Sequence, residues 1–357
     1  MLLYTHHMWN ELIEVPGLIR GLINNHRELF LIQHNILNIQ NIIHIKLIAS
    51  GSSYNVSLCG RFIFEEILGI PTTVEYASEF AHKNYAIDKN TLVIGISQSG
   101  KTADTLAALK KIKYDSGCQI FCITNVEDSP LFRLADHKIL IGAGIEKAVP
   151  ATKTFSLQLL ALFNLALYLG KLTNKNQDKL SFIHNELKLL PDQLDCVLKQ
   201  KEEIQQLAEI LAAKEHLVFL SRGITWAIAR EGALKYKETT CIDCNAYPAG
   251  EFIHGYMAIL DEKYYILALD FIKDSFLRAN LLKIKQNYNA SIFALTMDTT
   301  RLDLFKSFIS LPVTKTKLTA TFVFAACLQM MAYFSSVSLG YNPDKPKNLS
   351  KYLSREN

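Results

Sequence analysis

The amino-acid sequence predicts an α/β protein with two tandem subdomains, each built on a mostly parallel sheet flanked by helices. Two observations support this prediction. Short apolar stretches that suit strands alternate with segments of helical period, and this alternation occurs twice along the chain. The second occurrence also repeats residues of the first at a constant offset. Alternating strands and helices favour a parallel sheet covered on both faces, because each helix crosses a face between two strands.

The pattern divides the chain into five segments. They are a helical segment (1–39), a first subdomain (40–170), a helical connector (171–214), a second subdomain (215–340) and a C-terminal tail (341–357). In the first segment we expect one or two helices with a break at Pro16-Gly17, because proline removes a helical hydrogen bond. In the first subdomain, the expected strands are 44–50, 73–75, 91–97, 119–124 and 138–141, and the expected helices are 52–68, 103–114 and 153–170.

The internal repeat indicates a duplicated domain. An offset of 172 residues places Gly51 opposite Gly223 and Glu66 opposite Glu238. Without gaps, the same offset aligns ASEFAH with AGEFIH and CQIFCIT with ASIFALT, so one register holds over about 75 positions. The halves differ at one place: the hydroxyl-rich loop GISQSGKT has no such counterpart in ALDFIKDS.

Composition favours a cytoplasmic globular protein. Of the 357 residues, 49% are hydrophobic and 20% are charged, and the net charge is only +4, so no nucleic-acid partner is expected. The seven cysteines lie mostly in apolar runs, which suits reduced thiols better than disulfides. The N-terminus lacks the pattern of a signal peptide. The longest apolar run, 159–169, is too short to span a membrane and predicts a buried core helix.

The loop GISQSGKTADT (95–105) joins a predicted strand to a predicted helix. The first N–H groups of a helix lack intrahelical partners and carry partial positive charge. Hydroxyls of Ser97, Ser99 and Thr102 add donors, and Gly100 lets the backbone approach a ligand. Together these groups suit a phosphate dianion. The alternative is an ordinary serine N-cap. The spacing is not that of a Walker loop, so a nucleoside triphosphate is not expected.

Several motifs in order resemble the sugar isomerase (SIS) family. They are ASGSSYN, SQSGKTADTLAAL, AVPATKTF and EGALKYKE…AYPAGEFIHG. The resemblance is greatest to the isomerase half of glutamine–fructose-6-phosphate aminotransferases and to SIS-type glucosamine-6-phosphate deaminases. It covers nearly the whole chain and implies doubly wound, flavodoxin-like subdomains. It also implies that the sugar phosphate is held by Ser53, Ser97, Gln98, Ser99 and Thr102. Thr152 is a candidate contact to the sugar itself.

Moving a carbonyl between C1 and C2 of a sugar requires a proton to leave one carbon and return to the other, and one carboxylate can carry it. Glu231, Lys235 and Glu238 are spaced to lie on one helix face. The alternative is a solvated charged face. The resemblance implies that Glu238 is the base and that Lys235 contacts substrate; Lys235 would also help keep Glu238 ionised.

The resemblance assigns roles to two further side chains. His254 corresponds to a histidine that opens the sugar ring from the neighbouring subunit, which implies a homodimer. The repeat places His82 opposite His254. Lys351 corresponds to a C-terminal lysine that can form a Schiff base with the open ketose. The residues after Lys351, YLSREN, depart from the family pattern.

Two departures favour the deaminases over the aminotransferases. Ala151 stands where the aminotransferase has a serine, and Lys101 stands where it has an acid. We therefore expect a deaminase that converts glucosamine 6-phosphate to fructose 6-phosphate and ammonia, with no cofactor and no metal. The pair Cys241 and Cys244 lacks the further ligands of a zinc site.

Three alternatives remain. The chain could be the isomerase portion of an aminotransferase, although the first cysteine is Cys59 and no glutaminase-sized segment precedes the repeat. It could be another deaminase or a deglycase. It could also be a sugar-phosphate sensor, although the roughly 40 residues before the first strand hold no basic recognition helix.

Overall fold

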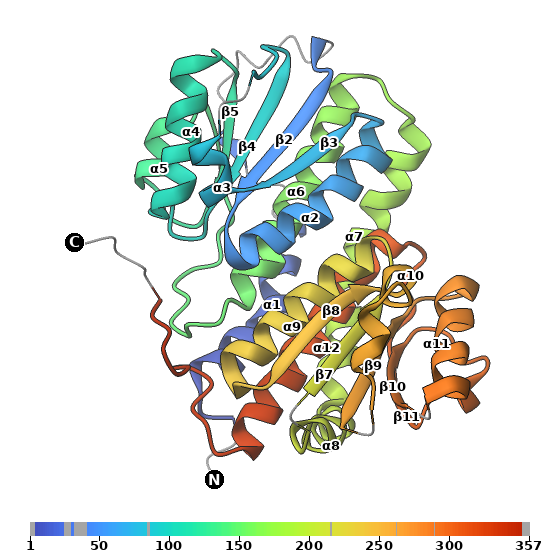
Figure 1. Cartoon of the computed structure of the whole chain (residues 1–357). Coiled ribbons are helices and arrows are strands. Elements are labelled where there is room, and N and C mark those ends of the chain that lie inside the picture. Colours follow the sequence, from blue (N-terminus) through green and yellow to red (C-terminus); the bar gives the residue numbers. More distant parts are fainter. Residues whose placement is uncertain are drawn as a thin grey trace. The chain divides into compact units, whose positions relative to one another are not determined.

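The computed structural model describes residues 4–24, 30–31, 41–83, 86–214, 216–261, 263–288 and 290–351. The described chain divides into two compact units, each with one sheet (Figure 1). The sheet A unit comprises 17–146 and 153–188, and the sheet B unit comprises the chain up to Pro16, 147–152 and 189–351.

The N-terminal helix α1 (His7–Asn24) contains Pro16 and runs without a break. The break predicted at Pro16-Gly17 is therefore wrong. Proline removes one backbone donor, but the buried apolar residues Leu12, Val15 and Ile19 on either side favour a continuous helix. Most of the expected helical stretch after Asn24 lies outside the described residues.

Sheet A has the strand order β1-β6-β5-β4-β2-β3. Five strands are parallel, and β1 pairs antiparallel with β6. The parallel strands have the flavodoxin-like order, in which the chain adds strands first on one side of β2 and then on the other. The strands are β1 (Phe30–Leu31), β2 (His44–Ala49), β3 (Thr72–Tyr76), β4 (Thr91–Ile96), β5 (Ile120–Thr124) and β6 (His137–Leu140).

Helices cover sheet A on both faces. They are α2 (Gly51–Leu68), α3 (Ala77–His82), α4 (Ala103–Asp115), α5 (Pro130–Leu134) and α6 (Lys153–Leu172). Phe80, Leu109 and Leu131, from α3, α4 and α5, share one core cluster with Ile48 of β2. On the other face, a Cβ at Gly60 of α2 would lie 2.8 Å from Leu162 of α6, so glycine permits their close packing.

Sheet B repeats this topology with the order β11-β10-β9-β7-β8, and all its strands are parallel. Its strands are β7 (His216–Ser221), β8 (Asp243–Pro248), β9 (Tyr264–Asp270), β10 (Ser291–Thr296) and β11 (Ser307–Ser310). Its helices are α9 (Ile224–Thr240), α10 (Ala249–Phe252), α11 (Ser275–Tyr288) and α12 (Lys317–Ser338), with short 3₁₀ turns η2 (Tyr256–Ile259) and η3 (Leu302–Leu304). The predicted connector is helical, with α7 (Gln177–Lys199) and α8 (Lys201–Ala212).

The offset of 172 residues predicted from sequence relates the two sheets. It maps β2 onto β7 residue for residue, and it maps α4 onto α11 and β5 onto β10 with ends that differ by one residue. The register slips by two residues at β6 and β11. Both Gly51 and Gly223 adopt positive φ, at 58° and 60°, so the repeat also conserves the turn before α2 and α9.

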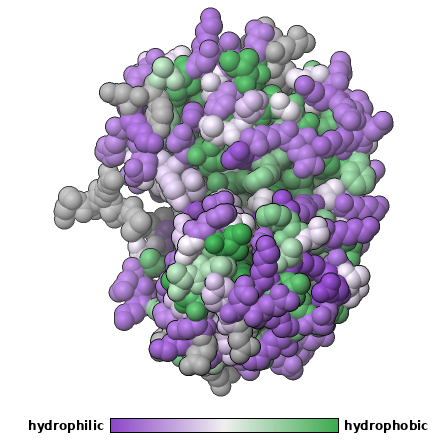
Figure 2. Space-filling model, turned by 45° about the vertical axis from the view of Figure 1, so that its right-hand side comes forward, coloured by the Kyte–Doolittle hydropathy of each residue, from purple (hydrophilic) through white to green (hydrophobic). Residues whose placement is uncertain are grey.

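Among the described residues, two helices are long and apolar enough to cross a membrane, α6 and α12. Their apolar windows are 78% and 100% buried inside the protein, however, which is typical of core helices. This agrees with the buried helix predicted around 159–169. Hydrophilic side chains cover much of the face drawn in Figure 2, with apolar residues in smaller groups.

Candidate functional site

The strand order of sheet A brings two hydroxyl-rich turns together. β2 and β4 are adjacent and parallel, with Ala49 opposite Ile96, so the turns that follow them leave the same edge of the sheet. One turn leads into α2, whose first turn carries Ser53, and the other begins at Ser97. The chain reverses its direction of strand addition between β2 and β4, and this is where open α/β sheets bind their ligands.

The loop after β4, Ser97–Thr102, gathers the predicted phosphate-binding hydroxyls. The Ser97 Oγ lies 2.8 Å from the Thr102 Oγ1, and it accepts a hydrogen bond from the Gly100 N–H at 3.1 Å. The Ser99 Oγ accepts from the Lys101 N–H at 3.2 Å. Thr102 is the N-cap of α4 but makes no side-chain cap hydrogen bond, because its hydroxyl contacts Ser97 instead. An ordinary N-cap therefore does not explain this loop.

Gly100 shapes the loop by a conformation and a contact that exclude other residues. Its φ is +62°, and a Cβ there would lie 2.1 Å from the Ser129 Oγ and 3.1 Å from the Thr124 Oγ1. Its carbonyl accepts a hydrogen bond from the Leu131 N–H at 3.0 Å. The loop is thus packed directly against the start of α5.

The remaining predicted phosphate-binding residues in this unit have defined anchors. The buried Ser53 donates to the Gln158 Oε1 of α6 at 3.0 Å. The Gln98 carbonyl accepts hydrogen bonds from the Asn125 N–H at 3.0 Å and the Thr124 hydroxyl at 3.3 Å. Gln158 was not predicted from the sequence, and only the position of α6 beside α2 identifies it as the partner of Ser53.

In the sheet B unit, α9 carries a buried chain of alternating charges. The Lys235 Nζ lies 2.5 Å from the Glu238 Oε2 and 3.5 Å from the Glu231 Oε1. The side chains of Lys235 and Glu231 are each 1% exposed, whereas that of Glu238 is 19% exposed. A solvated charged face is therefore wrong for these residues, and only Glu238 presents part of its carboxylate to solvent.

The buried lysine has a clear electrostatic consequence. An unpaired buried charge is very costly, so a buried lysine requires carboxylate partners. Lys235 holds Glu238 in one orientation while Glu231 balances the other side of the ammonium group. The arrangement can present one oriented carboxylate to a substrate, as proton transfer requires.

The other predicted residues of this unit lie on separate segments. His254 follows α10 and is exposed, and no hydrogen bond or ion pair joins its imidazole to Glu238 within the described part of the chain. The Lys351 Nζ donates to the Ala148 carbonyl at 2.5 Å. Thr152 is fully buried, with its carbonyl 3.5 Å from the Gln329 Nε2.

The segment near Thr152 is held by acidic side chains that sequence analysis did not identify. Both carboxylate oxygens of Glu11 accept from the backbone N–H of Ala148, and Glu11 also accepts from that of Lys147. In the sheet A unit, the buried Glu146 accepts from the N–H and the hydroxyl of Thr154 at 3.1 and 2.8 Å. No local sequence pattern predicts the contacts of Glu11, because its partners are distant in sequence.

Two α/β subdomains whose parallel strands have the same order, one of them with a hydroxyl-rich loop at its switch point, define a duplicated flavodoxin-like protein. The SIS domain model matches residues 38–168 and 210–338. The chain belongs to the SIS domain family.

Similar proteins include several of known name. The chain is 36% identical over 363 residues to glutamine–fructose-6-phosphate aminotransferase [isomerizing] of Caldanaerobacter subterraneus subsp. tengcongensis, covering 99% of this chain and 59% of that protein. The solved C-terminal domain of glucosamine-fructose-6-phosphate aminotransferase from Francisella tularensis has a TM-score of 0.88 and 31% identity, covering 96% of this chain and 99% of that one.

A solved glucosamine-6-phosphate deaminase from Thermotoga maritima has a TM-score of 0.73 and 23% identity, covering 97% of this chain and 98% of that one. At that identity the likeness concerns the fold alone. The chain spans about three fifths of the length of the aminotransferase of Caldanaerobacter subterraneus. Taken together, these similarities agree better with the aminotransferase alternative than with the deaminase prediction.

Proposed function

We propose that this chain is a sugar-phosphate isomerase that interconverts fructose 6-phosphate plus ammonia with glucosamine 6-phosphate plus water, working in the direction of synthesis. The observation that carries the proposal is the partly exposed Glu238 carboxylate, held 2.5 Å from the buried ammonium of Lys235. The 36% identity over 99% of the chain to an enzyme named as an isomerizing aminotransferase supports the same direction.

The loop Ser97–Thr102 binds the 6-phosphate in this proposal. Hydroxyls of Ser97, Ser99 and Thr102 donate to the phosphate oxygens, together with the N-terminus of the 13-residue helix α4. Ser53 and Gln98 complete the set. Binding the phosphate far from the reacting carbons provides energy that orients C1 and C2.

Glu238 transfers the proton in the proposed reaction. Ammonia adds to the C2 carbonyl of the open ketose, and loss of water gives an imine. Glu238 removes a proton from C1, which shifts the double bond to C1–C2, and returns it to C2. The products are an aldehyde at C1 and an amine at C2, which are the functional groups of open-chain glucosamine 6-phosphate. Lys235 holds the carboxylate in position throughout.

His254 and Lys351 act at the carbonyl end of the substrate in this proposal. An imidazole suits the transfer of a proton between the anomeric hydroxyl and the ring oxygen near neutral pH. Lys351 supplies an amine that can first form a Schiff base with the open ketose at C2, with loss of water, for which it must leave the Ala148 carbonyl. Ammonia then displaces the lysine and gives the same C2 imine. We also propose a homodimer in which His254 completes the neighbouring site, because its exposed ring makes no contact with Glu238 in the described part of its own chain.

The reverse direction is the second candidate. Ala151 and Lys101, which depart from the aminotransferase pattern, favour a deaminase that releases ammonia from glucosamine 6-phosphate. The same proton transfer serves both directions. For either direction we propose a cytoplasmic location, supported by seven cysteines that are all free of disulfides and all lie in the described chain.

Hydrogen exchange in D₂O tests the chemistry directly. With ammonia present, we expect one C1 proton of fructose 6-phosphate to exchange with solvent deuterium in the wild-type protein, followed by NMR. Glu238→Gln should abolish this exchange and leave phosphate binding nearly unchanged. The matched control is Glu66→Gln, because Glu66 occupies the equivalent repeat position in α2, and it should leave exchange unchanged.

Two further measurements separate the parts of the proposal. Full exchange by Glu238→Gln would remove Glu238 from the mechanism. Ser97→Ala combined with Thr102→Ala should raise KM sharply, and an unchanged KM would refute the phosphate loop. Ammonia-dependent formation of glucosamine 6-phosphate compared with ammonia release from it, each at matched concentrations, decides which direction the enzyme favours.

A further inference from the structure

The sheet B unit contains a pocket of about 430 Å³ at the carboxyl ends of β9 and β10. Three basic side chains line it, Lys273, Arg278 and Arg301. The other side is apolar and includes Leu282 of α11 and Leu304 of η3. Pockets for small organic ligands have this volume and this combination of an apolar wall with a few polar groups.

The pocket occupies the position in the second repeat that the phosphate loop occupies in the first. The offset of 172 places Lys273 opposite Lys101 and Arg301 opposite Ser129. Lys273 therefore lies just before α11 as Lys101 lies just before α4. The hydroxyls of the first loop are replaced here by charged residues, so the second site differs in chemistry from the first.

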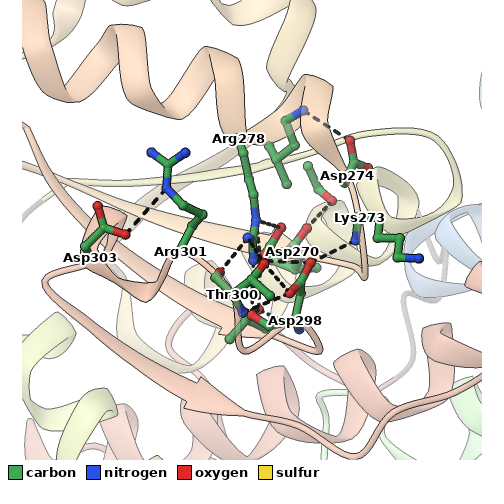
Figure 3. A network of polar contacts seen from close by, with 12 residues as sticks. Asp270, Lys273, Asp274, Arg278, Asp298, Thr300, Arg301 and Asp303 are labelled. Carbon is green, nitrogen blue, oxygen red and sulfur yellow. Dashed lines mark hydrogen bonds and ion pairs between the residues drawn. The ribbon is translucent and has the colours of Figure 1, made fainter.

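The guanidinium group of Arg278 is already bonded to other residues of the protein. Its Nη2 lies 2.7 Å from the buried Asp270 Oδ2, and its Nη1 donates to the Thr300 carbonyl at 2.5 Å (Figure 3). Burial raises the pKa of Asp270. The hydrogen bonds from Arg278 and Thr296 act in the opposite direction but do not cancel this rise. Arg278 and Asp270 therefore form a structural pair that builds the pocket wall and leaves no free charge.

Asp298 fixes the two loops that carry the other cations. It accepts from the Lys273 N–H at 2.9 Å, and from the Thr300 N–H and hydroxyl at 2.9 and 2.7 Å. Burial alone would raise the pKa of Asp298, but these hydrogen bonds outweigh it and lower the pKa to about 2. Lys273 and Arg301 lie on the two loops that Asp298 joins, and their φ values are +57° and +55°. This left-handed conformation costs free energy for residues with a side chain.

The two cations on these loops are available to a ligand. The Lys273 ammonium has no hydrogen bond or ion pair to any residue in the described part of the chain. Among the described residues, the Arg301 side chain has one ion-pair partner, the exposed Asp303 at 3.6 Å, with side chains 65% and 75% exposed. An exposed pair of this kind contributes little to stability, so a ligand can displace Asp303 at little cost.

We propose that this pocket binds a small organic monophosphate whose other end is planar and apolar, as in phenyl phosphate. The side chains of Lys273 and Arg301 point away from each other in Figure 3. Both are exposed, so each can turn toward the pocket to contact the phosphate, since guanidinium and ammonium groups are its usual partners. The planar body lies against Leu282 and Leu304. The site is distinct from the phosphate loop of the sheet A unit, which takes a polar sugar.

Isothermal titration of the full chain with phenyl phosphate tests the proposal. We expect binding with a Kd of about 1 mM or tighter. Lys273→Ala combined with Arg301→Ala should weaken it at least about tenfold. Both side chains are exposed, so these variants should fold. Lys283→Ala, a matched exposed lysine on α11 outside the pocket lining, should not change it.

Controls distinguish this site from the first. Ser97→Ala combined with Thr102→Ala should leave phenyl phosphate binding intact while it weakens binding of fructose 6-phosphate. Inorganic phosphate should bind more weakly than phenyl phosphate, and Leu282→Ser should remove this advantage. The proposal is overturned if phenyl phosphate does not bind at 10 mM, if the Lys273 and Arg301 substitutions have no effect, or if the Ser97 and Thr102 substitutions abolish its binding.

Discussion

Substituting Gly100 by alanine should damage the phosphate loop for two separable reasons. The first is its backbone, because φ is +62° and the left-handed region costs a residue with a Cβ roughly 1–2 kcal/mol. The second is contact, because the new Cβ would lie 2.1 Å from the Ser129 Oγ and 2.5 Å from the Ser129 Cβ. Overpacking of this kind typically costs 1–3 kcal/mol.

The sum predicts that Gly100→Ala lowers the free energy of unfolding by roughly 2–5 kcal/mol. Ser129 cannot move freely, because its hydroxyl caps α5 by accepting from the Phe132 N–H at 3.3 Å. Gly117→Ala is the matched control. Its φ is +65° but nothing lies within 4 Å of the new Cβ, so only the backbone cost of roughly 1–2 kcal/mol applies.

Urea unfolding of both variants measures these costs, and titration with fructose 6-phosphate measures the effect on binding. We expect Gly100→Ala to unfold at a clearly lower urea concentration than Gly117→Ala and to bind the sugar phosphate at least about tenfold more weakly, which corresponds to 1.4 kcal/mol. Adding Ser129→Gly to Gly100→Ala should recover the contact cost. Equal midpoints for the two alanine variants would refute the packing explanation.

Three further predictions concern the sheet B unit. Asp298→Asn should lower the free energy of unfolding by about 2 kcal/mol at pH 7, because the folded pKa of about 2 lies below the ordinary aspartate value of 3.8. This contribution is present above about pH 4 and is lost as the pH falls toward 2. The free energies of unfolding of the wild type and the variant, measured with urea, should therefore converge near pH 2. A difference that stays constant with pH would contradict the prediction. Lys235→Met should cost roughly 3–5 kcal/mol in the same assay, because it leaves the buried Glu231 and the partly buried Glu238 without a counter-charge, and wild-type stability would show that they are not paired. His254→Asn should lower kcat about 10²–10⁴-fold, as expected for loss of a general acid–base group, whereas His82→Asn should not, and equal rates in a steady-state assay would exclude ring opening by His254.

Much of the fold could be predicted from local patterns. The period of apolar residues located the strands and main helices of the first half within two residues, because side-chain periodicity depends only on neighbours along the chain. Proline in α1 misled the prediction, since buried contacts on one helix face outweighed the loss of one hydrogen bond. The resemblance to the SIS family was confirmed by the match over both halves of the chain.

The candidate site was only partly predictable. The hydroxyls of the loop after β4 are visible in sequence, and so is the spacing of Glu231, Lys235 and Glu238. Their burial is not visible, and the sequence left open a solvated face that the 1% exposure of Lys235 excludes. Residue spacing defines which side chains share a helix face, but only packing against other elements decides which face is buried.

The sequence by itself determined the duplication, the order of elements and the chemical character of the loops, because all three depend on residues that are close along the chain or related by one offset. The tertiary structure alone decided that β4 lies beside β2, which brings the turns of Ser53 and Ser97 to one edge. It also decided that Asp298 joins the loops of Lys273 and Arg301. Such contacts join residues far apart in sequence, so they arise only when the sheet has formed and its strand order is set.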